Sequence, residues 1–539
     1  MAGFSTHAIK GHFVRNVPSL HHEHSSYKWW VLVNVMIGTF MAVLDATIVN
    51  VALPKIMASF GVDIDTAEWV LTAYLLVFAV MLPTSGWVAD HFGYKRTYFM
   101  ALFLFTLGSF LCGLAWDEKV LIGFRVVQAI GAGFLMPVGM AIVTREFPPE
   151  QRGIALGFWS IAAAASVSLG PLIGGYLVDR ISWNAIFDVN VPVGLFALFA
   201  TMVIQREYRT EHTRSFDFVG FVLMSVSLGA LLLALSDGNA AWNTGGWSSP
   251  FIVACFVLSG VAGVAFLFVE FTTRHPLIDL SLFRDFNFSV TNAILFIFGL
   301  GMFGSTFLLP LYLQQSLGYT ALQAGALFLP VGIAQALTSP ISGMLSDRID
   351  PRLPAIIGIV GLGFTLYANS TLSIYSEREA ILVPLIIRGF AMGLMFTPLT
   401  TLALSGIPRH KIAQASGLFN VIRQLGGSFG VAIMGALLTR RTIFHAAQYG
   451  QMVDPQSATF RKITYGLAHF SELAVGSTPS TAAMQANALI ASHVMNQAFV
   501  QAVCDDFLIA AAITVAGIFP ILLLRRKKSQ SAPHVAAME

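Results

Sequence analysis

The chain of 539 residues alternates long apolar runs with short polar stretches from one end to the other. An apolar helix of about 20 residues crosses the hydrocarbon core of a bilayer, which is ~30 Å thick. The pattern therefore predicts an all-α, polytopic membrane protein. We expect fourteen transmembrane helices, near residues 29–53, 67–89, 98–116, 120–143, 154–178, 188–205, 217–236, 250–271, 287–312, 322–345, 353–373, 380–405, 412–439 and 504–524.

The basic residues between these runs predict the orientation of the helices. Twenty Lys and Arg residues fall on the side of the N-terminus and eight on the opposite side. Because cytoplasmic loops carry the excess of Lys and Arg, we expect residues 1–28 and 525–539 to be cytoplasmic tails. Three further arginines, Arg125, Arg388 and Arg423, lie inside predicted helices.

The composition fits a membrane protein and excludes other classes. Hydrophobic residues make up 56% of the chain and charged residues 11%, against roughly 25% charged in soluble proteins. A net charge of +3, with no basic stripe, argues against nucleic acid. The three cysteines have no metal-ligand spacing, and no Walker-type phosphate loop is present. We therefore expect a transporter rather than an enzyme, with no metal and no cofactor.

Asp45 stands out in the first apolar run. It is the only charged residue among the 26 that separate Lys28 from Lys55. A carboxylate at membrane depth is costly, and it usually marks an ion or substrate pathway. The alternative is an aspartate at a helix end that reaches the lipid headgroups.

An internal repeat divides the chain into two halves. Gly86-Trp87-Val88-Ala89-Asp90 recurs 257 residues later as Gly343-Met344-Leu345-Ser346-Asp347, and Arg125 has a rough counterpart in Arg388. Parallel repeats of this kind build many transporters. We expect a six-helix bundle over 29–205, two linker helices within 206–286, and a second bundle over 287–439 completed by 504–524.

Residues 440–503 interrupt this rhythm with a polar stretch of 64 residues. We predict a long periplasmic loop here, in which Thr478-Pro479 indicates the capped start of a helix. Long loops in compact proteins are often functional. A passive covering over the outer face is the alternative.

Three motifs resemble those of the major facilitator superfamily. Residues 86–96 resemble its motif A, in which charge pairs latch one conformation, and Arg125–Gly131 resembles motif B. Residues 170–175 match the core of motif C, the mark of exporters, where glycines permit close helix approach and a proline bends the helix. The residues concerned are Gly86, Asp90, Gly93 and Arg96 for motif A, and Gly170, Pro171, Gly174 and Gly175 for motif C.

The segment Leu44–Pro54 resembles the signature of the fourteen-helix drug:proton antiporters of the EmrB/QacA type. Further motifs of that group occur at 182–187, 190–194, 276–283 and 420–427, so the resemblance covers nearly the whole chain. It implies the major facilitator fold, with two six-helix bundles plus two extra transmembrane helices. It also implies multidrug efflux by proton-coupled antiport.

The same resemblance implies a site. It places the helices of Asp45 and Arg125 face to face, so that Arg125 favours an ionised Asp45 while burial favours the neutral acid. Asp45 and Arg125 are then the proton-coupling pair, and a permanent structural salt bridge is the alternative. Arg388 either binds acidic groups of substrates or caps carbonyl groups. Candidates for the substrate cavity are Gln128, Arg388, Asn420, Arg423 and Gln424.

The long outer segment is most like that of EmrB-type members. These imply lipophilic or cationic drugs and protons as ligands, a bacterial inner-membrane location and a role in antibiotic resistance. They also imply an EmrA-like periplasmic membrane-fusion adaptor and a TolC-like outer-membrane channel as partners. The alternatives are an exporter of one metabolite or siderophore, an uptake symporter, or a transport-inactive receptor or scaffold.

Overall fold

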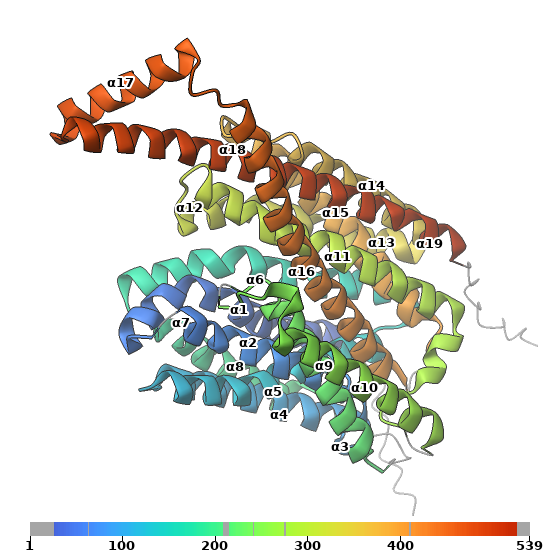
Figure 1. The fold of residues 1–539 in the computed structure, drawn as a ribbon. Coiled ribbons are helices and arrows are strands. Elements are labelled where there is room, and N and C mark those ends of the chain that lie inside the picture. The colour runs from blue at the N-terminus through green and yellow to red at the C-terminus, as the bar shows by residue number, and fades with distance from the viewer. Residues whose placement is uncertain are drawn as a thin grey trace, which may run out of the picture.

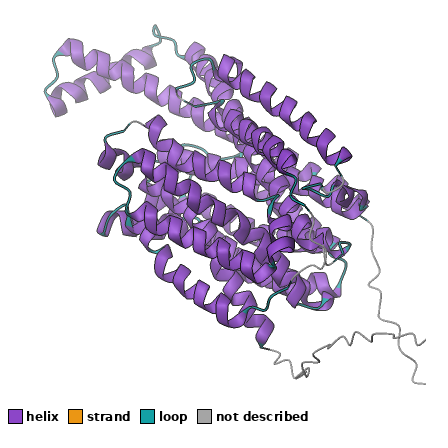
Figure 2. Ribbon diagram, turned by 90° about the horizontal axis from the view of Figure 1, so that it is seen from below, coloured by secondary structure: helices purple, strands orange, loops and turns teal. Residues whose placement is uncertain are grey.

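The computed structural model describes residues 26–524, except for 63, 209–214, 241, 274–275 and 409–410. The predicted tails therefore lie outside the described residues, apart from 26–28. Every regular element in the described part of the chain is a helix, as Figure 2 shows, and none of it forms a strand. Thirteen of these helices are long and apolar enough to cross a membrane, and fourteen if one bent pair is counted as a span. This is the number that the apolar runs predict.

The first half of the chain forms one bundle. Its second predicted helix is broken in two, with a bend of 57° between its parts. The helices are α1 (Tyr27–Phe60), α2 (Ile64–Met81), α3 (Ser85–Phe92), α4 (Tyr94–Gly113), α5 (Glu118–Glu146), α6 (Arg152–Arg180), α7 (Ala185–Asp188) and α8 (Asn190–Ile204), with the 3₁₀ turn η1 (Pro149–Gln151) before α6.

The linker and the second half follow the same plan. The linker consists of α9 (Phe218–Asp237), η2 (Gly246–Ser248), α10 (Pro250–Thr272) and η3 (Leu280–Arg284). The second half contains α11 (Phe286–Gln315), α12 (Ala321–Ala326), α13 (Leu329–Arg348), α14 (Arg352–Asn369), α15 (Arg378–Ser405), α16 (Ile412–Met452), α17 (Ala458–Val475), α18 (Pro479–Ala516) and α19 (Ile518–Leu523).

Most of the stretch 440–503 between the last two predicted spans is helical, whereas the sequence indicates only the helix that starts near Thr478-Pro479. Helix α16 continues past its apolar run to Met452, α17 follows, and α18 runs without a break into the last span. The apolar pattern marks where lipid ends, whereas a helix continues as long as its residues are good helix formers. The start of α18 lies where the sequence places it, since the Thr478 side chain accepts a hydrogen bond from the Thr481 N–H and Pro479 occupies the first turn. Figure 1 shows α17 and the first part of α18 projecting from the body as a hairpin.

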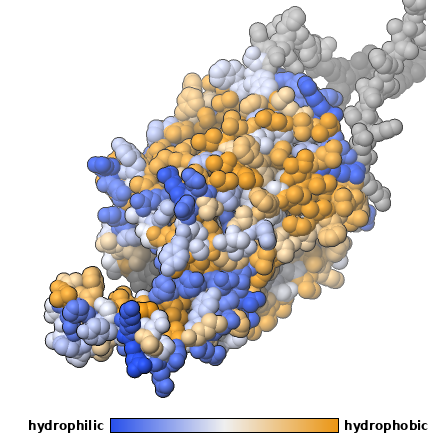
Figure 3. Space-filling view, turned by 90° about the horizontal axis from the view of Figure 1, so that it is seen from above, coloured by the Kyte–Doolittle hydropathy of each residue, from blue (hydrophilic) through white to orange (hydrophobic). Residues whose placement is uncertain are grey.

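The hairpin and motif A lie at opposite ends of the molecule (Figure 1). The hairpin end carries α17, and the motif A end carries α3 and the turn between α13 and α14. Large apolar side chains are exposed along α8, α10 and α14. Figure 3 shows hydrophobic residues over much of one face of the body, as expected of a surface that meets lipid.

The two halves meet along two seams. In one seam α6 packs along α13, and in the other α3 packs against α16. Linker helix α9 packs against α2 of the first half and α16 of the second, as well as against α10 (Figure 1). Helix α9 of the linker therefore belongs to the packing between the halves.

Candidate functional site

Asp45 lies near the middle of α1, because this helix runs on past Pro54 to Phe60 and does not end at 53 as predicted. A Gly61 with φ of 66° ends it in the left-handed conformation that glycine adopts without strain. The side chain of Asp45 is completely buried. Since Asp45 is buried and distant from both helix ends, the alternative of an acid that reaches the headgroups does not hold.

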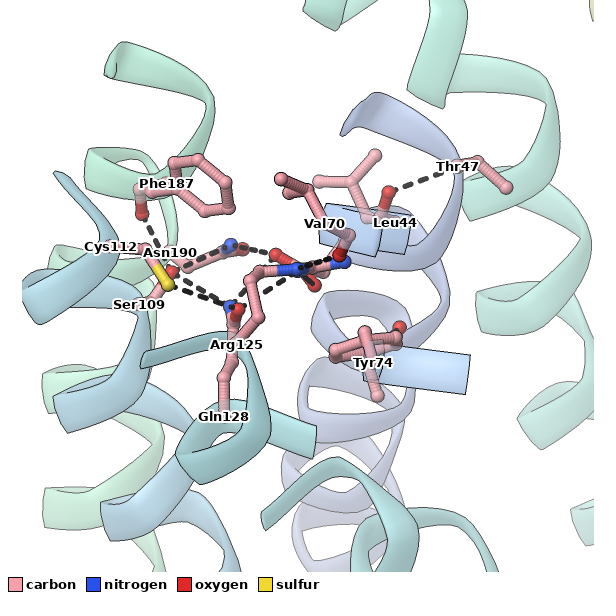
Figure 4. Close-up of polar contacts among 12 residues, drawn as sticks. Leu44, Thr47, Val70, Tyr74, Ser109, Cys112, Arg125, Gln128, Phe187 and Asn190 are labelled. Carbon is pink, nitrogen blue, oxygen red and sulfur yellow. Dashed lines mark hydrogen bonds and ion pairs between the residues drawn. The ribbon is translucent and has the colours of Figure 1, made fainter. Parts of the chain in front are cut away.

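Arg125 of α5 forms an ion pair with Asp45 (Figure 4), and both side chains are completely inaccessible to solvent. Its Nη1 contacts Asp45 Oδ2 and also donates to Gln128 Oε1 at 2.9 Å. Its Nε donates to the Val70 carbonyl oxygen of α2 at 3.2 Å. The structure thus brings together the two residues that the sequence predicts as a pair.

The second oxygen of Asp45 is held by two amides. Gln128 Nε2 donates to Asp45 Oδ1 at 2.8 Å, and Asn190 Nδ2 of α8 lies 3.4 Å from the same atom. Both amides also donate to Ser109 Oγ of α4, each at 3.1 Å. Ser109 in turn donates to the Phe187 carbonyl at 2.9 Å. Six helices of the first half, α1, α2, α4, α5, α7 and α8, therefore contribute to one hydrogen-bond network around this carboxylate.

Apolar and aromatic groups enclose this polar network. The Tyr74 ring lies 4.0 Å from the guanidinium carbon of Arg125, and the Phe187 ring lies 5.6 Å from it. Tyr74 is itself fixed, because its hydroxyl donates to the Ala42 carbonyl of α1 at 3.2 Å. Cys112 donates weakly to Gln128 Oε1 at 3.8 Å. A guanidinium held over an aromatic face and bonded to a carbonyl keeps partners when its carboxylate is neutralised.

Sequence reasoning missed part of this site. Gln128 was expected in the substrate cavity, but the structure places it on Asp45, one helical turn beyond Arg125. Ser109, Tyr74 and Asn190 were given no role, although Asn190 belongs to a quoted motif. Uncharged polar residues are common in transmembrane helices, so these three carry no signal without a known neighbour.

Motif C packs against the helix that carries Asp45. A methyl group added at Gly174 would lie 2.8 Å from Ile48 Cγ1, and one at Gly170 would overlap Thr47. The opposite face of the same segment meets the second half, since a methyl group at Gly325 of α12 would lie 2.6 Å from Pro171 Cβ. Gly175 faces Leu322 in the same way. Motif C therefore connects α1 to the other half of the protein.

Motif A lies at the second seam. A methyl group at Gly86 would lie 2.7 Å from the Gln414 Cα of α16, so this glycine permits the close approach of α3 and α16. Asp90 accepts a hydrogen bond from the Tyr94 hydroxyl at 3.0 Å. Gly93 has φ of 98°, and Arg96 lies 3.5 Å from Glu207. The contact of Asp90 stays within the first half, and that of Arg96 reaches the start of the linker.

The second copy of the motif A segment, at residues 343–347, contacts the first half of the protein. Asp347, at the end of α13, accepts hydrogen bonds from the backbone N–H groups of Gly153 at 3.0 Å and Ile154 at 3.1 Å. These N–H groups belong to the first turn of α6, where the helix dipole favours a negative charge. The halves are thus joined at the motif A end by a carboxylate on a helix N-terminus.

The cavity candidates of the second half do not meet the Asp45 site. Buried Arg388 donates through Nη2 to the Met302 carbonyl at 3.2 Å and to the Thr306 hydroxyl. No carboxylate pairs with it within the described residues. Arg423 donates to Asn420 Oδ1 at 3.3 Å, and Asn420 donates to the Ser416 carbonyl at 2.9 Å. Gln424 is half-buried beside them on α16.

An aromatic cluster joins the halves near Arg423. The Arg423 guanidinium lies 5.6 Å from the Phe396 ring, which stacks 6.5 Å from Trp159 of α6. Phe396 also meets Phe419 edge-on at 6.3 Å. Trp159 donates to the Thr39 hydroxyl of α1 at 3.0 Å. We name Trp159, Phe396 and Phe419 the interface aromatic cluster.

A polytopic helical protein with two related halves and a buried ion pair at membrane depth is a membrane transporter by architecture. The profile of the Major Facilitator Superfamily matches residues 35–218 and 214–431. The chain therefore belongs to the major facilitator superfamily.

Known relatives agree with this assignment. The chain is 34% identical to the multidrug export protein EmrB of Haemophilus influenzae over 479 residues, which cover 88% of this chain and 91% of that protein. It is 32% identical to the fatty acid resistance protein FarB of Neisseria gonorrhoeae over 501 residues, covering 92% and 96%. Among solved structures, the human organic anion transporter MFSD10 superposes with a TM-score of 0.59 at 13% identity, covering 92% and 99% of the two chains. That likeness concerns the fold alone.

Proposed function

We propose that this protein exports lipophilic drugs in exchange for protons across a bacterial inner membrane, with the motif A end in the cytoplasm. One observation carries the proposal: the ion pair between Asp45 and Arg125 lies at the centre of a fully buried polar network. The similarity to EmrB, whose name is multidrug export protein, supports drugs as the cargo. The basic loops at the motif A end support the orientation.

In the proposed cycle Asp45 alternates between two protonation states. When Asp45 takes up a proton from the outer side, the attraction to Arg125 falls, and the guanidinium keeps the Val70 carbonyl and the Tyr74 ring as partners. When Asp45 later releases the proton to the cytoplasm, the ion pair re-forms. A membrane potential of 100 mV contributes about 2.3 kcal/mol for each charge moved.

Motif C provides the route from Asp45 to the seam between the halves. Thr47 and Ile48 follow Asp45 on α1 and touch Gly170 and Gly174, while Pro171 touches α12 of the second half. Because these contacts are closely packed, a small displacement of α1 is transmitted rather than absorbed. We infer that protonation of Asp45 biases the α6·α13 seam.

Asp347 supplies the latch that opposes this movement. Its carboxylate on the first turn of α6 holds the motif A end shut. The described conformation is therefore closed toward the cytoplasm in the proposed orientation. Opening to the cytoplasm requires these two hydrogen bonds to break.

The interface aromatic cluster is our candidate for the drug-binding surface. Trp159 and Phe396 come from opposite halves, so both would move apart when the halves rock. Aromatic faces bind flat lipophilic compounds without demanding directional bonds, which suits a pump with many substrates. Arg423 beside Phe396 adds one charged contact.

Export of acidic lipophilic compounds is a second candidate. Arg388 is buried without a carboxylate partner in the described residues, and its Nη1 donates to no atom of them. A buried guanidinium with a spare donor is suited to an acidic group of a ligand. The name of FarB, fatty acid resistance protein, is consistent with acidic cargo in a relative.

The hairpin is the proposed docking element for a periplasmic adaptor. It bears exposed apolar side chains on α17, among them Tyr465, Phe470 and Leu473. Replacing residues 453–478 with a short Gly/Ser linker should abolish capture of an EmrA-like adaptor while dye export from liposomes persists. Unchanged capture of the adaptor by the shortened pump would sink this part of the proposal.

The main proposal is tested in proteoliposomes under an imposed proton gradient. Wild type should expel a fluorescent lipophilic dye and dissipate the gradient as it does so, whereas Asp45→Asn should do neither. Asp454→Asn, at an exposed position in the turn between α16 and α17, is the matched control. Dye-driven proton movement by Asp45→Asn at the wild-type rate would contradict the proposal.

A further inference from the structure

A second buried carboxyl group lies far from the Asp45 site. Asp506 of α18 is completely inaccessible to solvent, and neither of its oxygens has a hydrogen-bond partner among the described residues. Ionised carboxylates in such surroundings lose their hydration without replacement, at a cost of several kcal/mol. An isolated carboxyl group therefore stays neutral when it is buried in this way.

The neighbouring acid, Asp505, differs from Asp506 because it has charged partners. Asp505 Oδ2 lies 2.8 Å from His445 Nε2 and 3.7 Å from Arg441 Nε, both on α16. Successive residues of a helix point about 100° apart, so Asp506 does not share these partners. The two adjacent acids have different environments within one turn.

The charged groups around Asp506 are few. Asp505 precedes it in the chain, and Arg441 of α16 lies 3.7 Å from that neighbouring acid. Helices α11, α14, α16, α17 and α19 pack against α18. Helix α11 has one other titratable side chain, Tyr312, which donates to the Ser373 carbonyl, and α14 has Arg352 and the exposed Tyr367. The remaining titratable side chains of these helices within the described residues are Arg423, Arg440, His445 and Tyr449 on α16 and Arg461, Lys462, Tyr465, His469 and Glu472 on α17, while α19 has none.

Its depth places Asp506 toward the hairpin end. It lies 17 residues before Leu523, the last residue of α19, which corresponds to ~26 Å along a helix. The hydrocarbon core is ~30 Å thick. The nearest water is therefore that of the hairpin side, which is the outer compartment in the proposed orientation.

We propose that Asp506 is a second proton-binding site, separate from Asp45 and loaded from the hairpin side of the membrane. Binding forms one O–H bond at the carboxylate, with the proton supplied by water of that compartment, and release returns the proton to water and leaves a charge that Arg441 partly balances. As the pH of the outer compartment falls, Asp506 is then protonated before the transport cycle proceeds. This role as an acidity sensor rests on the proposed function, whereas the presence of the bound proton does not.

Infrared difference spectroscopy on the purified full-length protein tests the bound proton directly. Spectra recorded between neutral and alkaline pH should contain the carbonyl band of a protonated carboxyl group in wild type. Asp506→Asn should lose this band, while Asp45→Asn and the matched neighbour Asp505→Asn should keep it. Asp506→Glu should restore a band at a shifted frequency. Absence of the band from wild type, or its persistence in Asp506→Asn, would contradict the proposal that Asp506 binds a proton.

Export assays test the sensor role separately. In proteoliposomes with the inner pH held constant, the dye-export rate of Asp506→Asn should respond less to outer pH than that of wild type. An unchanged response would overturn the sensor role. Failure of the antiport proposal is recognised independently, because it appears as undiminished proton-coupled export by Asp45→Asn.

Discussion

Gln128 holds the oxygen of Asp45 that Arg125 leaves open, donating to Oδ1 at 2.8 Å while the guanidinium contacts Oδ2. The same carboxylate is thus oriented by two side chains from one face of α5. A hydrogen bond to a charged group contributes about 1.5–3 kcal/mol. The geometry of the ion pair therefore depends on a neutral residue.

Gln128→Ala should consequently lower both stability and coupling. We expect a loss of about 1.5–3 kcal/mol of unfolding free energy, seen as a lower midpoint in thermal unfolding, together with dye export that moves fewer protons. Adding Asn190→Ala should cost less, since its bond to Asp45 is longer, at 3.4 Å. Equal stability of Gln128→Ala and wild type would show that the amide does not hold the carboxylate.

Asp347→Asn should weaken the closure of the motif A end. The substitution keeps the size of the side chain but removes the charge from the N-terminus of α6, an interaction worth ~0.3–2 kcal/mol. The seam should then open more often. In a background without native cysteines, Ser339→Cys, which is buried in that seam, should react faster with a thiol reagent when Asp347→Asn is present.

The control for this measurement is Asp350→Asn, three residues further along the chain, which contacts Arg352 on its own side of the seam. It should leave the labelling rate of Ser339→Cys unchanged. Equal rates for Asp347→Asn and wild type would remove the latch from the mechanism.

Gly174→Ala should disturb packing between α6 and α1. Its methyl group would meet Ile48 at 2.8 Å, and overpacking of this kind costs about 1–3 kcal/mol. We expect a lower unfolding temperature and slower export. Gly229→Ala on α9, where a methyl group meets no atom within 4 Å, should behave as wild type. Similar behaviour of the two variants would contradict a special role for motif C.

The linker should loosen in acid. Asp279 lies 2.5 Å from Lys411. Burial raises the pKa of Asp279, but the hydrogen bond and charge of Lys411 and the bonds from Ser281 outweigh it, so its pKa is lowered overall. A lowered pKa in the folded state means that the pair stabilises the protein above the ordinary pKa of ~3.9 and that this contribution is lost as pH falls below it.

Limited proteolysis of the segment 276–285 checks this expectation. Cleavage by an acid-active protease should accelerate as the pH drops through the range below the ordinary aspartate pKa. Asp279→Asn should be cleaved quickly across the whole range and lose the pH dependence. A pH profile that is the same for both proteins would exclude Asp279 as the cause.

The sequence predicts the spans and the central pair well, for a physical reason. Lipid demands apolar runs of fixed length, and a lone charge such as Asp45 within a run needs a partner such as Arg125. Other features leave no such trace. The partners of Asp347 are backbone N–H groups, which any residue supplies, and Asn190 meets Asp45 only because α8 folds back beside α1.

Helix boundaries are the other point at which sequence reasoning falls short. The apolar run that ends at 53 is followed by Pro54, which lacks a backbone N–H donor. The run that ends at 439 is followed by Arg440, whose charge marks the change from lipid to water. In both places the helix continues, to Phe60 and to Met452. Hydropathy reports the surroundings of a segment, not the end of its hydrogen-bond ladder.

The position of α9 has a consequence for access to the α3·α16 seam from the lipid. Helix α9 lies against both α2 and α16, and therefore covers the flank of the molecule where the α3·α16 seam opens sideways. A compound dissolved in the membrane that approaches this flank meets a continuous helical wall. Helix α9 thus shields the α3·α16 seam from the bilayer, and its position between α2 and α16 ties the linker to both halves.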